Sequence, residues 1–502
     1  MAGTPLPAPL TVATFAEQES IFKAAVGTAI SVDEKAWDFR SRFECLRSRV
    51  LDRGHADWEG DDPRIARLVE HYESGLRAKG LIDFDDMALI GHRIITGNEW
   101  VCKALKARFP ILVIDEYQDL GVALHEIVVA LMASGVRVLA VGDPNQSIYG
   151  FTGAVPKLLT TLGGQSDVEV VRLNFNYRCG RSIVRTSRIT IPSTFEEIPQ
   201  VDHEGLVEWH HKPFGIDAQA EFICTELIPA IKARRPSTTL GDIAVLYPSK
   251  YDGDVIARAA TKASIDFTRI DQNAAYRKTP LTRWLEQCAA WCSGGWNSGG
   301  LPLSSIIRTW LRFNPSASTQ SHIRRLKRVL VRTLIDNRSS HQLLLLWLHE
   351  LEDKFLRSTL EAEPTLREER AEFQRLKEAA KPRGELDRCT VARFGAHEGI
   401  SNYLNLITLH SSKGREFDAV IVMGCDDGKL PSRGTPEEQE EKRRLFYVGL
   451  TRAKFEFHMT YSGGIETRNG GWWEKGPSPF LLEIQAQATQ HQELADEEDC
   501  PF

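Results

Sequence analysis

Short apolar runs alternate with stretches of helical periodicity along much of this chain. Runs at 111–114, 136–141 and 168–173 have the length of strands and are separated by sequence that is typical of helices. The alternation resumes with runs at 206–210 and 243–247 on either side of a helical stretch at 217–234, and again with runs at 404–410 and 419–424. Such alternation predicts an α/β fold with a mostly parallel sheet and crossover helices.

Helical periodicity dominates the remaining stretches. Residues 15–26 and 64–79 place apolar side chains at helical spacing, and the Gly-Asp-Asp-Pro sequence at 60–63 is a start signal for the second of these helices. Residues 281–395 are helix-rich and highly charged, with a basic stretch at 322–332. We therefore expect a second α/β region, opening near residue 203, that is interrupted by a helical insertion.

The bulk composition is that of an ordinary globular protein. With 502 residues, of which 42% are hydrophobic and 26% charged, the chain should form several domains. No apolar run is long enough to span a bilayer and the N-terminus has no secretory pattern, which makes a cytoplasmic location the expectation. The net charge of −6 argues against a broad basic surface, so any nucleic acid should bind in a local groove with stacking groups.

The nine cysteines include no C-x-x-C pair. Cys288 and Cys292 lie one helical turn apart, a spacing that metal ligands can have. Two thiols without further ligands do not complete a zinc site, so we expect them to be core residues.

Two acidic residues follow the apolar run at 111–114. Asp115 and Glu116 begin the sequence DEYQD and should lie at the carboxyl edge of a strand, where α/β sheets bind ligands. One carboxylate there can hold Mg²⁺, while its neighbour orients the water that attacks a phosphate. Taken alone, the pair is more often a set of exposed acids at a strand end.

Further sequences follow this pair in a fixed order. They are VGDPNQSIYGFTGA at 141–154, LNFNYR at 173–178, TLHSSKGREF at 408–417 and YVGLTRAK at 447–454. With DEYQD, this set resembles motifs II to VI of the superfamily 1 helicases of the UvrD/Rep/PcrA type. AKGLIDF at 78–84 and PSPFL at 477–481 extend the resemblance, which covers residues 15 to 485.

The resemblance implies two RecA-like P-loop NTPase lobes, the first incomplete, with helical insertion subdomains. The expected segments are a helical 1B-like subdomain at 1–90, the remainder of lobe 1A at 91–200, the first part of lobe 2A at 201–280, a helical 2B-like insertion at 281–395, the second part of lobe 2A at 396–485 and an acidic tail at 486–502. The basic stretch of the insertion could contact duplex phosphates, although a solvated helix face is about equally expected.

The resemblance also implies catalytic roles. Asp115 would coordinate Mg²⁺ and Glu116 would act as the catalytic base. Gln146 matches the glutamine that senses the γ-phosphate of ATP, a role that suits an amide able to donate and accept. Arg178 and Arg452 match two arginines that reach the γ-phosphate, where a planar guanidinium stabilises charge spread over several oxygens.

Other positions are implied to bind nucleotide or DNA. Glu416 matches a glutamate near the nucleotide ribose, and Gly414 would permit close approach of the backbone. The positions that face single-stranded DNA would be Tyr149, Phe151, Thr408 and His410. Phe151 stands where the family usually has tryptophan, and Thr152 where it often has arginine. Stacking should persist with less area, while a contact of the arginine is lost; Phe151 as a core residue is the alternative.

The glycine-rich loop G-x-x-x-x-G-K-[ST] does not occur in residues 1–502. That loop gives backbone N–H groups and a lysine to the phosphates, and without it Asp115 and Glu116 would repel a triphosphate. In the family, the strand that leads into the loop lies beside the runs at 111–114 and 136–141, so we expect exposed apolar surface there. A mis-assigned start, a truncated gene or a split motor whose second chain brings the loop would each explain the sequence.

These observations favour an ATP-dependent translocase or helicase on single-stranded DNA, which by family analogy moves 3′ to 5′ and uses ATP and Mg²⁺. DNA junctions are a further expected substrate, and DNA repair is one of several pathways that fit. The alternative is a catalytically inactive DNA-binding or partner subunit derived from such a helicase. Residues 1–502 alone are expected not to hydrolyse ATP.

Overall fold

The computed structural model describes residues 10–498, except for 32–34, 61, 151–152, 193–196, 271–275, 298–301, 340, 383, 385, 396–402 and 467–471. The chain divides into two compact units. Unit 1 comprises Met1–Phe175, Thr190–Ile198 and Gly434–Val448, and unit 2 comprises Asn176–Ile189, Pro199–Arg433 and Gly449–Phe502.

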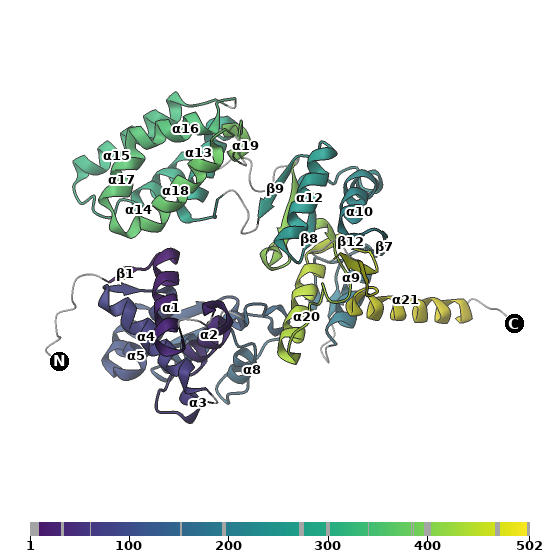
Figure 1. The fold of residues 1–502 in the computed structure, drawn as a ribbon, viewed down its shortest axis with the longest axis horizontal. Coiled ribbons are helices and arrows are strands. Elements are labelled where there is room, and N and C mark those ends of the chain that lie inside the picture. The colour runs from purple at the N-terminus through teal and green to yellow at the C-terminus, as the bar shows by residue number, and fades with distance from the viewer. Residues whose placement is uncertain are drawn as a thin grey trace. The chain divides into compact units, whose positions relative to one another are not determined.

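The elements up to residue 199 are mainly helices joined by short strands (Figure 1). The helices are α1 (Phe15–Ala29), α2 (Arg40–Arg49), α3 (Ala56–Glu59), α4 (Pro63–Ala78), α5 (Phe84–Gly97), α6 (Glu99–Arg108), α7 (Val122–Ala133), α8 (Lys157–Gly163) and α9 (Arg181–Thr190). The strands are β1 (Thr11–Val12), β2 (Leu81–Ile82), β3 (Ile111–Ile114), β4 (Arg137–Ala140), β5 (Phe175–Asn176) and β6 (Ile198–Pro199).

The two helices predicted near the N-terminus are confirmed as α1 and α4. Thr14 and Glu17 form a capping box that satisfies backbone N–H groups at the start of α1, and Pro63 begins α4 after the cap Asp62. Their apolar faces, with those of α2 and α3, close a core that includes Phe22 and Leu68. Local sequence signals predicted these two helices because the capping residues and the helical periodicity indicate the same segments.

The first α/β region contains a smaller sheet than the sequence indicates. β3 and β4 confirm two predicted strands and form a two-stranded parallel sheet, whereas residues 168–173 are not a strand. Val171 and Leu173 are highly exposed, so the apolar run was misleading: in the described structure it does not pair with a strand. Ile111 and Val113 are 58% and 63% exposed, which confirms the expected apolar surface.

Unit 2 is built on a six-stranded sheet in the order β7-β12-β11-β8-β10-β9, and every pairing in it is parallel. Its strands are β7 (Leu206–His211), β8 (Ile243–Tyr247), β9 (Phe267–Ile270), β10 (Leu404–Thr408), β11 (Phe417–Val422) and β12 (Ala453–Tyr461). Helices α10 (Gly215–Phe222), α11 (Ile228–Arg234) and α12 (Lys250–Lys262) join its core. The predicted helix at 217–234 is confirmed as α10 and α11, joined by one π-helical turn at Ile223–Leu227.

The stretch predicted as a helical insertion is confirmed as helical. Its helices are α13 (Pro280–Ala290), α14 (Leu303–Arg312), α15 (Gln320–Asp336), α16 (Leu344–Leu351), α17 (Arg357–Ala362), α18 (Arg367–Ala380) and α19 (Val391–Gly395). They share one core, in which Trp284 and Trp310 stack with ring centroids 5.2 Å apart. Cys288 and Cys292 are free thiols buried in this core, as expected, and burial is the main cause that raises the pKa of each.

The remaining elements lie after β11 in the chain. They are α20 (Pro436–Leu450), the antiparallel pair β13 (Gly464–Glu466) and β14 (Trp472–Glu474), and α21 (Pro479–Glu498). The mixed α/β class with a parallel sheet is therefore confirmed, while the RecA-like lobes and the segment boundaries stay predictions. Across the part of the chain that the structure describes, each helix is too short or too polar to cross a membrane.

Candidate functional site

The acidic pair lies where the sequence places it, at the carboxyl end of β3. Asp115 and Glu116 are both exposed, and the backbone N–H of Glu116 donates to Asp115 Oδ1 at 2.9 Å. Glu116 has φ 55° and ψ 42°, in the left-handed region that non-glycine residues seldom adopt. Strained backbone of this kind is concentrated at functional sites, and here it turns the chain sharply directly after the strand.

Gln118 holds the acidic loop to the loop that follows β4. Its Nε2 donates to Glu116 Oε2, and its Oε1 accepts the backbone N–H of Asp143 at 3.0 Å. The Gln118 side chain is fully buried, so its amide has a defined orientation. A Cβ on Gly142 would lie 2.3 Å from Gln118 Oε1, which explains why glycine is needed at that point. The carboxylate of Glu116 is therefore positioned by a buried partner.

Gln146 belongs to the same edge of the β3–β4 sheet. Asp143 caps the 3-10 turn at Pro144–Gln146 by accepting the N–H of Asn145 at 2.9 Å. Its other carboxylate oxygen accepts from Gln146 Nε2, also at 2.9 Å. The structure thus brings Asp115, Glu116 and Gln146 to the carboxyl ends of two neighbouring parallel strands, linked through Gln118 and Asp143.

The aromatic positions of the motif lie next along the chain. Tyr149 is half-buried, and its pKa is raised first by burial and then by the negative charges of Asp119 and Glu116. Those charges show that the phenol lies within the field of the acidic loop. Phe151 and Thr152 lie outside the described residues.

In unit 2, Arg178 and Glu416 form an ion pair. The distance from Arg178 Nη2 to Glu416 Oε1 is 2.5 Å, and Lys454 Nζ lies 3.5 Å from the other carboxylate oxygen. All three side chains keep more than a third of their surface exposed, so the cluster is open to a ligand. Two cations around one carboxylate leave a net positive charge that suits an anionic group.

Backbone contacts fix the segments that carry this cluster. The side-chain oxygen of Asn176 accepts the N–H groups of Arg178 and Cys179, both at 2.9 Å, and Gly180 donates its N–H to the carbonyl of Lys454 at 2.9 Å. Gly414 has φ 76° and open space where a Cβ would stand. The turn before Glu416 therefore needs a left-handed residue and leaves room for a ligand.

Arg452 lies behind this cluster and is almost fully buried. Its guanidinium donates to the carbonyl of Arg415 at 3.4 Å and to the hydroxyl of Thr451 at 3.1 Å. The backbone N–H of Phe417 donates to the carbonyl of Arg452 at 2.9 Å. In this structure Arg452 supports the segment that carries Glu416, and its role toward a phosphate stays a prediction.

Thr408 and His410 lie at the carboxyl end of β10. The hydroxyl of Thr408 accepts the N–H of Ser411 at 3.2 Å and donates to its hydroxyl at 2.9 Å, which shapes the turn after the strand. His410 is partly buried, and burial lowers its pKa, so its ring is neutral at pH 7. A neutral imidazole is suited to stacking and hydrogen bonding.

Two side chains in these arrangements were not assigned from the sequence. Gln118 stands inside the DEYQD sequence, where an amide two residues after the glutamate was the available signal. Lys454 ends the sequence at 447–454 and was visible only as one more basic residue. Each contacts a residue far away in the chain, Asp143 for Gln118 and Glu416 for Lys454, which a linear sequence does not indicate.

The acidic loop also fits the divalent ion that the motifs imply. Asp115 is an exposed carboxylate with one oxygen engaged by the backbone of its neighbour. Mg²⁺ prefers such oxygen ligands and is usually bound by one or two carboxylates together with the phosphates of a substrate. Asp115 is therefore the residue that would hold it.

Comparison with protein families identifies two regions. Residues 11–166 match the UvrD/REP helicase N-terminal domain, and residues 389–464 match the UvrD-like helicase C-terminal domain. The first match contains the acidic loop and the turn with Gln146. The second contains Gly414, Glu416 and Arg452.

Individual proteins match over much of the chain. The ATP-dependent DNA helicase UvrD2 of Mycobacterium tuberculosis is 26% identical over 450 residues, which cover 85% of this chain and 58% of the mycobacterial protein. Rep of Escherichia coli is 27% identical over 500 residues, covering 85% of this chain and 71% of its own length. PcrA of Staphylococcus aureus is 24% identical over 533 residues, covering 93% and 71%. The chain thus spans less than two thirds of the mycobacterial relative.

Proposed function

The two matched regions show that this chain belongs to the UvrD/Rep/PcrA-like superfamily 1 helicases, and on that basis we propose that it forms the greater part of an ATP-driven motor on single-stranded DNA. The observation that carries this proposal is the acidic loop. Glu116 is held in a left-handed turn at the strand end, beside Asp115 and on a buried amide. A chain that had lost selection for catalysis would not need that costly geometry.

Glu116 is proposed to accept the proton of the water that attacks the γ-phosphate. Its carboxylate is exposed, oriented by Gln118 and close to the amide of Gln146 through Asp143. Mg²⁺ held by Asp115 would offset phosphate charge. Gln146 is proposed to release Asp143 and turn its amide toward the phosphate, since the hydrogen bond between the two side chains is only partly buried.

The basic cluster of unit 2 is proposed to respond to the same nucleotide. Arg178 is paired with Glu416 and not with a phosphate in this structure, so binding of ATP would exchange one anionic partner for another. Glu416 would then be free to accept a hydrogen bond from the ribose beside Gly414. Arg452 is proposed as a second phosphate-sensing residue, which requires it to leave its buried contacts.

Single-stranded DNA is the proposed track. Tyr149, Phe151 and His410 offer rings on which bases can stack, and Thr408 offers a hydroxyl at the end of β10. Stacking is worth roughly 1–3 kcal/mol per base and is tolerant of sequence, because every base has a π-face. Movement from 3′ to 5′, action at DNA junctions and work in DNA repair follow by analogy with the family.

A DNA-binding experiment tests the track on residues 1–502. The fluorescence anisotropy of a labelled oligothymidylate should rise on binding, and log K should fall with log salt by roughly 0.7 for each phosphate contacted. His410→Ala should weaken binding by about 1–3 kcal/mol if the ring stacks on a base. His349→Ala, which removes a ring from α16 in the helical insertion, is the matched control. Equal affinity of all three proteins would remove His410 from the DNA site.

ATP turnover separates the motor from its alternative. Residues 1–502 contain no phosphate-binding loop, so we expect no DNA-stimulated release of phosphate from this polypeptide alone. Turnover should appear when the loop is supplied, either by sequence encoded upstream in frame or by a second chain. Turnover by residues 1–502 alone that Glu116→Gln abolishes would refute our view that the loop is required.

The second candidate function is a catalytically inactive DNA-binding or partner subunit derived from such a helicase. The same absence of a loop within residues 1–502 favours it. This alternative predicts that the protein binds DNA but does not hydrolyse ATP. Turnover should stay absent even when a loop-bearing segment or chain, found by searching the surrounding genomic sequence, has been added.

A further inference from the structure

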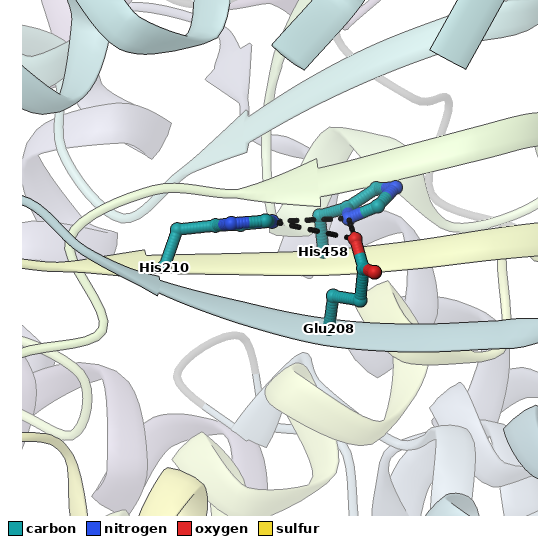
Figure 2. A group of neighbouring side chains, drawn as sticks. All are labelled: Glu208, His210 and His458. Atoms are coloured by element: carbon teal, nitrogen blue, oxygen red, sulfur yellow. Dashed lines mark hydrogen bonds and ion pairs between the residues drawn. The ribbon is translucent and has the colours of Figure 1, made fainter. Parts of the chain in front are cut away.

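Three potential metal ligands converge on one face of the sheet in unit 2, as Figure 2 shows. Glu208 and His210 are alternate residues of the edge strand β7, so their side chains share a face. His458 lies in the adjacent strand β12, directly opposite Glu208 in the register. One ligand atom from each of the three lies within 4.8 Å of the others, and among the described residues this is the group that meets such a criterion.

The distances between these atoms match a tetrahedral site. His210 Nε2 lies 3.3 Å from His458 Nδ1, His458 Nδ1 lies 3.4 Å from Glu208 Oε2, and His210 Nε2 lies 3.8 Å from the same oxygen. When ligand atoms bind tetrahedral zinc at 2.0–2.1 Å, neighbouring ligand atoms are about 3.3–3.4 Å apart. Two of the three distances already have this length. The third, 3.8 Å between His210 and Glu208, ends at a long and partly exposed glutamate side chain that can move closer.

A further carboxylate orients His458. The other ring nitrogen, Nε2, lies 3.0 Å from Glu456 Oε2, and Arg234 Nη2 lies 2.7 Å from that same carboxylate oxygen. Metal-binding histidines almost always donate their second ring N–H to such a partner, which fixes the tautomer. Glu456 is itself held by Arg234, so the carboxylate that contacts His458 has a fixed position.

The other ring nitrogen of His458, Nδ1, faces the two remaining members of the group. It lies 3.4 Å from Glu208 Oε2 and 3.3 Å from His210 Nε2, while Nε2 of the same ring contacts Glu456. The His458 side chain is fully buried. One carboxylate oxygen and two ring nitrogens therefore share one small volume, and each of these atoms can serve as a metal ligand.

The charges around the group permit a cation. Arg234 is paired with Glu456, and the amino group of Lys212 lies 3.5 Å from the centre of the Phe222 ring. Arg234 and Lys212 are therefore each engaged by a partner outside the three-residue group.

We propose that Glu208, His210 and His458 bind a divalent transition-metal ion, and that Zn²⁺ fits best. Two imidazole nitrogens and one carboxylate favour zinc and its neighbours over Mg²⁺ or Ca²⁺, which prefer oxygen alone. Three protein ligands leave a fourth position for water, on the side where Glu208 and His210 are partly exposed. The ion would fasten the edge strand β7 to β12, and this role does not depend on the proposed motor function.

Metal binding to chelator-treated protein, residues 1–502, tests the proposal. Titration with Zn²⁺ against a chromophoric chelator should show one equivalent bound, and the melting temperature should rise until that equivalent is reached. His210→Ala and Glu208→Gln alter partly exposed side chains, and each should weaken binding by at least about tenfold. Glu456→Gln should weaken it by about 10–100-fold while the ligand set is unchanged.

The matched control is His211→Ala, which removes the next imidazole on the same strand. His211 stacks on Tyr461 and lies 3.3 Å from the carbonyl of Ser462, outside the group, so its loss should not change Zn²⁺ affinity. Co²⁺ provides the spectroscopic check: d–d bands of a four- or five-coordinate ion without thiolate charge-transfer bands support the site. Absence of a stoichiometric equivalent, thiolate bands, or equal affinity of the wild type and His210→Ala would each overturn it.

Discussion

Replacing Glu116 by glutamine is expected to lower ATP turnover by about 10²–10⁴-fold, which is the usual contribution of a general base. Glutamine keeps the shape of the side chain and can still pair with Gln118, but it cannot take a proton from water. The loss should therefore fall on kcat, while the KM for ATP and the affinity for DNA stay near the wild-type values. The assay is phosphate release with oligothymidylate present, on the assembly that supplies the phosphate-binding loop.

A matched variant separates this effect from a general change of charge. Glu169→Gln removes one exposed carboxylate from the same unit, outside the acidic loop, and should leave turnover within about twofold, since surface substitutions rarely act at a distance. If Glu116→Gln retained wild-type kcat, the base would have to be another group and the proposed role of the acidic loop would be wrong.

Replacing Arg47 by methionine is expected to lower the free energy of unfolding by about 3–5 kcal/mol, the cost of leaving buried charges without their partner. Arg47 is only 3% exposed, and it donates to Asp83 at 2.6 and 3.0 Å, to Asp86 at 2.8 Å and to Glu73 at 3.3 Å. Methionine fills much of the volume but cannot balance these acids. Urea denaturation followed by tryptophan fluorescence measures the loss.

The same helix provides the control. Arg42 also lies in α2 and pairs with an acid, Asp62, at 2.9 Å, but about half of its side chain is exposed. Arg42→Met should therefore cost less than about 1 kcal/mol. A similar small cost for Arg47→Met would show that the buried network contributes little to stability.

The pH dependence of stability has a defined sign for the buried network around Arg47. Burial alone would raise the pKa of Asp83, but hydrogen bonds and charge from Arg47 hold it below its ordinary value. In the wild type this contribution to stability is present at neutral pH and is lost as pH falls through the folded pKa. In Arg47→Met the cation is gone, so burial should raise the pKa of Asp83 in the folded protein above its value in the unfolded chain. Lowering the pH then stabilises the folded variant, because protonation removes the buried charge. The difference between the two proteins should narrow as pH falls.

The sequence predicted the parallel sheet of unit 2 because its central strands β8, β10 and β11 are almost completely buried and read as continuous apolar runs. β8, for example, is fully buried along Ile243–Tyr247. The same rule failed at 168–173, since an apolar run becomes a strand only where another strand is available for pairing. β12 was missed because Lys454 and Glu456 interrupt its apolar pattern.

The candidate site was predictable as a set of residue types but not as an arrangement. The order of motifs located Asp115, Glu116 and Arg178, yet the burial of Arg452 and the amide bridge of Gln118 depend on contacts between distant segments. The group around His458 was invisible for the same reason: the pairing of β7 with β12 sets which side chains face each other across the sheet. Register is a property of the folded chain.

The helical insertion buries a core whose side chains all come from one continuous stretch, between Tyr276 and Phe394. Its contacts are therefore made within one stretch of the chain, so this core can form without side chains of the sheet. Amide protons of α13 and α18 should exchange with solvent together, as one cooperative block, at a rate separate from that of the central sheet strands. Deleting this stretch and joining its ends would accordingly remove a whole folding unit and leave the sheet's own interior intact.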